Sequence, residues 1–185
     1  MATIESFPAS PPVRRLQRGE TLSTGPWQIH EGYVRALTWD EDGELITLAL
    51  WGPGDCLPAE VIEVHPYVLE ALTPCCLRIV PHDPGVSAAA SAGLRGEVLL
   101  SIVGCRRVSS RLLKLLLWIG ARFGSPTRNG WQVDLPLSHQ TLAELIGSTR
   151  ATITRLLGQL EQEGRLQRGL GQSLVITHDS LSPCA

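Results

Sequence analysis

The 185-residue sequence lacks any uninterrupted apolar run of the roughly 18–20 residues that a membrane helix requires. The longest candidate spans residues 112–121 and is interrupted by Lys114. The N-terminus, MATIESFPASPPVRR, also lacks the apolar segment of a secretory signal peptide. These absences predict a cytoplasmic protein with no membrane segment.

Metal and disulfide spacings are missing as well. The cysteines form no CxxC pair and no Cys/His pattern typical of zinc. Cys75 and Cys76 are adjacent, which suits neither an ordinary disulfide nor two ligands of one tetrahedral site. In a reducing cytoplasm we expect reduced thiols that mostly fill apolar space, and no metal. The five cysteines are Cys56, Cys75, Cys76, Cys105 and Cys184.

Catalytic motifs are absent too. The five histidines do not cluster with a carboxylate as a metal-dependent cupin requires, and no GxSxG, P-loop or dinucleotide-binding GxGxxG occurs in the right context. The sequence therefore predicts a protein that is not an enzyme and has no cofactor. These absences count against a cupin-like enzyme, which is the alternative from a different functional class.

Charge is distributed unevenly along the chain. Residues 1–108 contain 8 Lys and Arg against 13 Asp and Glu, whereas residues 109–185 contain 8 against 5. An acidic first part and a basic last part indicate two modules. The second, basic module is the one expected to bind a polyanion.

The first module is predicted to be β-structure. Short apolar stretches at 19–22, 33–39, 45–51, 67–72 and 75–80 alternate with turn sequences such as DEDGE and GPGD. Strands this short with frequent turns indicate a sandwich or small barrel.

From about Pro84 the pattern changes to that of a long helix. Apolar residues recur at steps of 4, 4, 3 and 7 residues and form one stripe. Either the stripe packs on the β-module, or it is the seam of a coiled coil in a homodimer. A second helix from Ser109 to about Phe123 is apolar nearly all round and belongs to the core. The stripe consists of Leu94, Val98, Ile102, Cys105 and Leu112.

Residues 137–166 predict a helix–turn–helix. Ser138 is a suitable N-cap for a helix over 139–146, and Gly147 permits a sharp turn. Ser148 or Thr149 then caps a second helix that runs to about Glu163. Its apolar side consists of Ile153, Leu156, Leu157 and Leu160.

The opposite face of this second helix is suited to a DNA major groove. Arg150, Ala151, Thr154 and Arg155 share it. An Arg can bond a guanine edge bidentately, a Thr can contact a thymine methyl or a phosphate, and an Ala leaves room. Residues 164–178 then predict a β-hairpin wing, where Arg165 and Arg168 are candidate phosphate contacts.

The winged helix-turn-helix of Crp/Fnr transcription regulators resembles this segment closely, in particular that of the branch of the cyanobacterial nitrogen regulator NtcA. The motif that carries the resemblance is LSHQTLAELIGSTRATITRLLGQLEQEGRL at 137–166. It continues upstream through SSRLLKLLLWIGARFG, and EGYVRALTWDEDGELITLALWGPGD resembles the family's sensor β-roll.

The resemblance implies an α+β fold with three parts. These are a cupin-like β-roll related to cyclic-nucleotide-binding domains (1–84), a dimerisation helix (85–110) and a winged helix-turn-helix (111–185). It also implies a sequence-specific transcription regulator that binds palindromic double-stranded DNA as a homodimer, with one recognition helix per half-site and RNA polymerase as a further partner.

The resemblance also assigns DNA contacts. Arg150, Ala151 and Arg155 take the base-reading positions, and Ala151 replaces the Glu of cyclic-AMP-type members, which points to GTA/TAC-type half-sites. Phosphate contacts at the helix N-termini fall to His139, Gln140, Ser148 and Thr149.

The sensor departs from the family pattern. The segment CLPAEVIEVHPYVLEAL follows GPGD, and no Arg occurs there to pair a phosphate. Glu60 matches the family's Glu, whereas Ala92 stands at the helix position where the nitrogen regulators hold 2-oxoglutarate, with Arg95 nearby and Glu97 matching. The roll is shorter than the family's, and an N-terminal iron–sulfur cysteine cluster is absent. We expect a degenerate sensor or an effector other than a cyclic nucleotide. The open alternative is a redox- or gas-responsive regulator that uses Cys or His in the roll.

Overall fold

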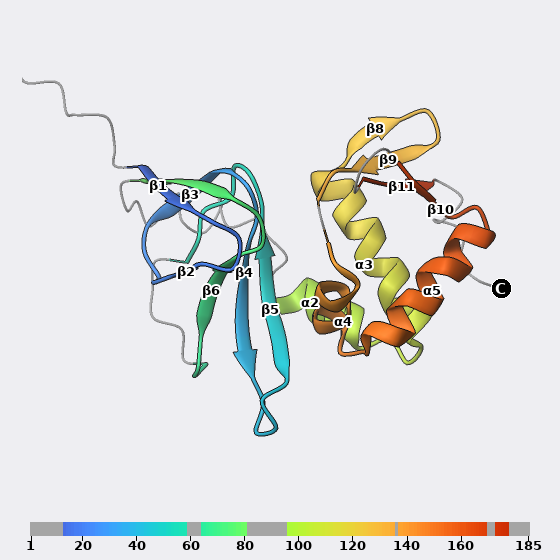
Figure 1. Cartoon of the computed structure of the whole chain (residues 1–185), viewed down its shortest axis with the longest axis horizontal. Helices are drawn as coiled ribbons and strands as arrows, with labels where there is room; N and C mark the ends of the chain where they lie inside the picture. The colour runs from blue at the N-terminus through green and yellow to red at the C-terminus, as the bar shows by residue number, and fades with distance from the viewer. Residues whose placement is uncertain (1–12, 59–63, 81–95, 136, 170–172, 178–185) are drawn as a thin grey trace, which may run out of the picture. The chain divides into compact units, whose positions relative to one another are not determined.

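The computed structural model describes residues 13–58, 64–80, 96–135, 137–169 and 173–177 (Figure 1). The chain divides into two compact units. The first comprises Met1–Thr38 and Ala49–Leu94, and the second comprises Trp39–Leu48 and Arg95–Ala185.

The first unit contains two antiparallel sheets with strand orders β1-β7-β3 and β2-β6-β4-β5, except that Trp39–Leu48, which includes the last residue of β4 and the start of β5, is grouped with the second unit. Apolar side chains such as Ile29 and Leu77 of the first sheet and Leu69 of the second are buried. The predicted strands at 33–39, 45–51, 67–72 and 75–80 are present as β4 to β7, whereas β1 and β3 were not predicted. The strands are β1 (Val13–Leu16), β2 (Thr21–Leu22), β3 (Trp27–Glu31), β4 (Val34–Trp39), β5 (Leu45–Trp51), β6 (Val68–Ala71) and β7 (Cys75–Ile79).

Two turns are held as their sequences require. The Asp40 carboxylate accepts the backbone N–H groups of Asp42 at 3.0 Å and Glu44 at 2.9 Å, which closes the β4–β5 hairpin. After β5, the buried Asp55 carboxylate accepts the Gly52 N–H at 2.9 Å. Short acidic side chains therefore stabilise both reversals locally.

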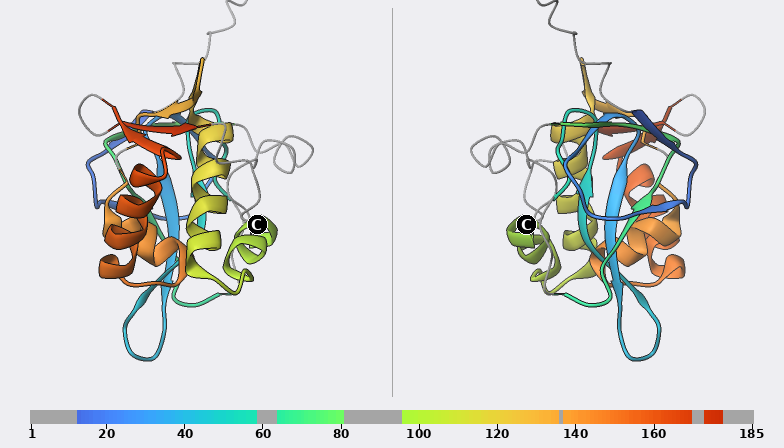
Figure 2. Two further views of the ribbon diagram at one scale, coloured as in Figure 1. Left: turned by 90° about the vertical axis from the view of Figure 1, so that its right-hand side faces the viewer. Right: turned by 90° about the vertical axis from the view of Figure 1, so that its left-hand side faces the viewer.

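The second unit combines helices with a four-stranded sheet of order β10-β11-β9-β8. Helix α3 lies at its centre and buries Leu112, Leu115, Leu116 and Ile119. Figure 2 shows α3 beside α5. The elements are α2 (Gly96–Val103), α3 (Val108–Phe123), β8 (Ser125–Thr127), β9 (Gly130–Val133), α4 (His139–Ile146), α5 (Arg150–Gln162), β10 (Leu166–Arg168) and β11 (Leu174–Thr177).

The expectation of one helix running to Leu112 is wrong. Helix α2 ends at Val103, so Cys105 lies in the connection and Leu112 lies on α3. The Arg111 side chain donates to the Cys105 carbonyl at 2.8 Å, which satisfies a backbone group that a continuous helix would have bonded internally. Gly104 at this point also favours a break, because glycine is a poor helix former.

The apolar stripe is divided by this break. Ile102 is only 2% exposed, and α2 packs against α3 and α4. Leu100 is instead the exposed apolar side chain of α2, at 69%. Val98 is half-buried, and Leu94 lies outside the described residues. The exposed face of α2, which is the one available to a partner, therefore presents Leu100 and not the predicted stripe.

Candidate nucleic-acid interface

The α4–turn–α5 geometry is set by local hydrogen bonds. Ser138 caps α4 by accepting the Thr141 N–H at 3.0 Å, and Thr149 caps α5 by accepting the Thr152 N–H at 3.2 Å. Between the helices Gly147 has a φ of 61°, in the left-handed region that glycine occupies without a steric penalty. The predicted caps and turn are therefore confirmed, with Thr149 rather than Ser148 as the second cap.

Helix α5 presents a polar face to solvent. Arg150, Ala151, Thr154 and Arg155 are all exposed, whereas the predicted apolar side of the helix is buried. In the part of the chain that the structure describes, neither Arg150 nor Arg155 forms an ion pair. Both guanidinium groups are thus available to bind an anion or the edge of a guanine.

Thr154 is fixed by two contacts of its hydroxyl group. Its Oγ1 donates to the Arg150 carbonyl at 2.9 Å and lies 2.8 Å from Nδ1 of His139. The Thr154 hydroxyl donates its only proton to the Arg150 carbonyl. In the contact with His139 the Thr154 oxygen is therefore the acceptor, and the Nδ1–H of His139 is the donor. The Thr154 methyl group remains for an apolar contact, and His139 links α4 to the exposed face of α5.

The other predicted phosphate contacts have intramolecular partners. Gln140 donates to Glu144 at 2.9 Å, and Nε of Arg168 donates to Glu161 at 2.7 Å. Both are exposed pairs, which contribute little stability and can rearrange. Ser148 is half-buried at the turn, beside Thr149.

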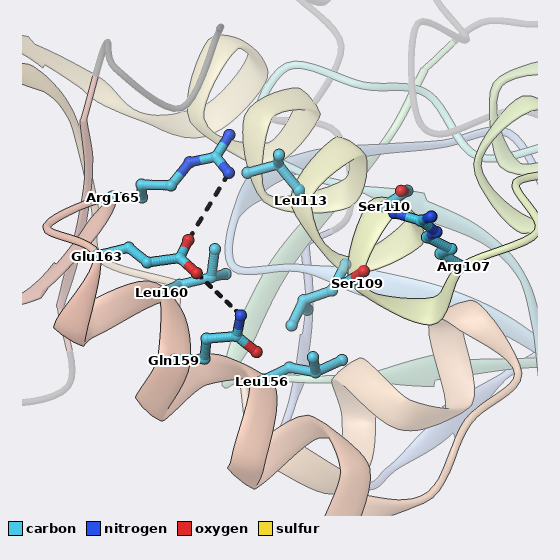
Figure 3. Close-up of a pocket in the computed structure, with 10 residues that line it drawn as sticks. Arg107, Ser109, Ser110, Leu113, Leu156, Gln159, Leu160, Glu163 and Arg165 are labelled. Carbon is cyan, nitrogen blue, oxygen red and sulfur yellow. Dashed lines mark hydrogen bonds and ion pairs between the residues drawn. The ribbon is translucent and has the colours of Figure 1, made fainter. Parts of the chain in front are cut away.

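Arg165, the other predicted wing contact, points elsewhere. Its side chain is only 13% exposed, and Nη1 lies 3.8 Å from the Glu163 carboxylate. Glu163 also accepts from Gln159 at 2.9 Å. Figure 3 shows Arg165 at a pocket of about 200 Å³. Arg168, and not Arg165, is therefore the exposed arginine of the wing.

This pocket lies between the first turns of α3 and the C-terminal half of α5 (Figure 3). Leu112, Leu113, Leu156 and Leu160 line it on its apolar side, and Arg107 lies at the start of α3. Leu156 and Leu160 belong to the buried side of α5, so the pocket is separate from the polar face. The spacing of apolar residues in the sequence did not predict this pocket.

Of the three predicted effector residues, the structure describes Glu97 alone. Glu60 and Arg95 lie outside the described residues, and Glu97 is exposed in the first turn of α2. In the β-roll, Nε of Arg35 bonds the Glu70 carboxylate at 2.8 Å, across directly paired positions of β4 and β6. This arginine is therefore engaged within the protein.

The cysteines of the β-roll differ in burial, with Cys56 and Cys75 buried and Cys76 half-buried. Burial raises the pKa of the Cys75 thiol, and burial together with the nearby Asp55 carboxylate raises the pKa of Cys56, so both are poor nucleophiles. Cys76 is half-buried on the other face of β7, and Cys184 lies outside the described residues.

No group of three or more His, Cys, Asp or Glu side chains that could hold a metal is found among the described residues. Of the helices that the structure describes, none has the length and apolarity to span a bilayer.

Comparison with known proteins gives consistent matches. Residues 107–180 match the Crp-like helix-turn-helix domain. The chain is 43% identical over 189 residues to the regulatory protein CysR of Synechococcus elongatus, with 96% of this chain and 91% of that protein covered. It is 46% identical over 176 residues to the global nitrogen regulator of the same organism, with 81% and 79% covered.

Solved structures match the fold over most of the chain. FixK2 from Bradyrhizobium japonicum aligns with a TM-score of 0.73 at 19% identity, covering 96% of this chain and 100% of that chain. A CRP-family regulator from Thermus thermophilus aligns with a TM-score of 0.68 at 24% identity, covering 89% and 91%. These likenesses confirm the predicted class of a β-roll followed by a winged helix-turn-helix.

Proposed function

Because this chain belongs to the Crp/Fnr family of transcription regulators, we propose that it binds a palindromic operator as a homodimer, with α5 of each protomer in the major groove. The observation that carries the proposal is the polar face of α5. On it, two arginines that form no ion pair with any described residue flank a small side chain and an oriented threonine. Such a face combines bidentate donors with room for base edges.

Each residue then has a role. Arg150 and Arg155 bond guanine edges, and the Thr154 methyl group contacts a thymine. Ala151 provides no acceptor for a cytosine amino group, in keeping with half-sites of the GTA/TAC type. His139, Gln140, Ser148, Thr149 and Arg168 contact phosphates and fix the register of the protein on the duplex.

Dimerisation is proposed through the region 85–110 that separates the β-roll (1–84) from the DNA-binding part (111–185). A palindromic site requires two recognition helices about 34 Å apart, one turn of DNA. The exposed Leu100 of α2 supports a partner contact there, because a large apolar side chain gains free energy when it leaves water. The buried Ile102 contributes to packing within its own unit instead.

The stretch 57–77, which would cradle an effector in the sensor, is proposed not to bind cyclic AMP and to bind 2-oxoglutarate weakly or not at all. The stretch 57–77 contains Glu60, Glu63 and Glu70 but no Lys or Arg, and Arg35 is already paired with Glu70. A buried anion there would lack a cationic partner. Isothermal titration with each ligand, paired with operator binding at fixed salt, measures this. Micromolar binding coupled to tenfold tighter DNA binding would refute it.

Operator binding is tested by selecting bound sequences from a random DNA pool and then measuring affinity by fluorescence anisotropy. Arg150→Ala and Arg155→Ala should each cost about 1–3 kcal/mol per half-site and relax the preference at one base pair. Arg128→Ala is the matched control, because it removes an exposed arginine from the β8–β9 turn at the other end of the unit (Figure 1). Unchanged base preference in Arg150→Ala would show that α5 is not the reading helix.

A further inference from the structure

An open pocket of about 450 Å³ lies on the β1-β7-β3 sheet of the first unit. Arg15 on β1 is paired in register with Cys76 on β7, and Val13 is paired with Arg78. Because side chains alternate along a strand, Arg15, Cys76 and Arg78 share one face, opposite the buried Leu77. All of them except Leu77 line the pocket.

The third strand adds two ionisable side chains. The register between β3 and β7 shifts between Ile29 and Glu31, and both His30 and Glu31 line the pocket. The following residue, Gly32, has a φ of 87° and sits so close to Cys75 that an added Cβ would lie 2.6 Å from its sulfur. Gly32 therefore lets the end of β3 approach β7 closely, next to the pocket residues Glu31 and Cys75.

The pocket concentrates positive charge in an acidic part of the chain. Residues 13–80 contain five arginines and no lysine, against ten Asp and Glu. Arg35 is paired with Glu70, and Arg14 lies 5.9 Å from the ring centre of Trp27. Arg15 and Arg78 form no ion pair with any residue that the structure describes. Two guanidinium groups in one concavity, with an imidazole beside them, form a site of complementary charge for an anion.

We propose that this pocket binds a small molecule carrying two or more oxyanion groups, either phosphates or carboxylates. Arg15 and Arg78 each bond one group through their paired N–H donors, and the His30 ring supplies a further N–H. Its volume falls within the range of roughly 300–1,000 Å³ that is common for small-molecule sites. The stretch 57–77 contributes Cys76 to this pocket but no cationic group, and Arg15, Arg78 and His30 all lie outside that stretch.

A small ligand fits the surroundings better than a nucleic acid does. Glu31 lines the same pocket, and the excess of acidic residues over 13–80 repels a long polyanion. A compact molecule can place its charges on the two arginines and direct a neutral part toward Glu31. The positive charge of Arg15 and Arg78 is thus confined to the pocket, whereas residues 13–80 as a whole are acidic.

The test uses the full chain and two probes, inorganic pyrophosphate and citrate, which separate phosphate from carboxylate recognition. Isothermal titration at matched ionic strength should show saturable binding of at least one probe. Arg15→Gln and Arg78→Gln should each weaken it about tenfold. Arg18→Gln is the matched control, because Arg18 is exposed in the turn after β1 and does not line the pocket. It should leave the affinity within about twofold, since it removes the same charge without a direct contact.

Cys76 supplies a second measurement that locates the ligand. Its alkylation by iodoacetamide, followed by peptide mass spectrometry, should slow several-fold when the bound probe is present. The proposal is overturned if neither probe binds saturably, if Arg18→Gln weakens binding as much as Arg15→Gln, or if binding leaves alkylation of Cys76 unchanged. It is also overturned if a short DNA duplex displaces the probe and protects Cys76, because the partner would then be a nucleic acid.

Discussion

Arg111 is expected to be a major stabilising residue of the second unit, because one side chain closes the ends of two helices. Its Nε donates to the Cys105 carbonyl at 2.8 Å, and Nη1 donates to the Ile146 carbonyl at 3.2 Å. The first bond holds the break after α2, and the second lies at the last turn of α4, directly before Gly147. A positive charge there also interacts favourably with the α4 dipole.

The magnitude follows from these two bonds. A hydrogen bond from a charged group contributes roughly 1.5–3 kcal/mol when it is buried, and the longer, half-buried bond contributes less. We therefore expect Arg111→Met, which keeps the aliphatic stem, to lower the free energy of unfolding by about 2–3 kcal/mol. The free energy of unfolding of Arg111→Lys should lie between those of Arg111→Met and the unchanged protein, because a single ammonium group cannot reproduce the fork of the guanidinium.

The assay is urea unfolding followed by far-UV circular dichroism, since every helix that the structure describes lies in the second unit. With a slope of about 1–3 kcal/mol/M, the midpoint should fall by roughly 1 M. Arg106→Met is the control, because Arg106 is exposed and makes no ion pair with the described residues. If Arg111→Met shifts the midpoint no further than Arg106→Met does, the carbonyl contacts do not stabilise the unit.

Three further outcomes are expected. Arg168→Ala should weaken binding to all DNA sequences alike and reduce the slope of log affinity against log salt by about one per half-site, as titration at several salt concentrations will show; a sequence-dependent loss would contradict a phosphate role. Leu100→Asp should give a monomer by analytical ultracentrifugation at a concentration where the unchanged protein is dimeric, whereas an unaltered dimer would place the interface elsewhere. Burial raises the pKa of Tyr67 from 10.0 to about 12. The unfolded chain therefore loses this proton first, and stability should fall as the pH rises between these values. Tyr67→Phe should remove this part of the loss of stability at alkaline pH. If the free energy of unfolding depends on pH identically in the two proteins, burial of Tyr67 does not cause the loss.

Local sequence was sufficient to predict the helix–turn–helix and the strands whose ends are marked by tight turns. Ser138, Gly147 and Thr149 act on backbone groups within three or four residues, so their effect can be read without knowing the rest of the fold. The spacing of Ile153, Leu156, Leu157 and Leu160 likewise indicated which side of α5 is buried and which side is free for DNA. The strands β4 and β5 were predicted because the Asp40 turn between them is local.

Features that depend on residues far apart in the sequence could not be predicted from local sequence, and the tertiary structure was needed to establish them. Strands β1 and β3 are short, and they exist because both pair with β7, about fifty residues or more along the chain. Helix α2 ends at Val103 although its apolar period continues, because Arg111 returns from α3 to bond the Cys105 carbonyl. The pairing of Arg35 with Glu70, and the shared face of Arg15 and Arg78, follow from strand register. Register is set by contacts across the whole sheet, and a one-residue shift would turn each of these side chains to the other face.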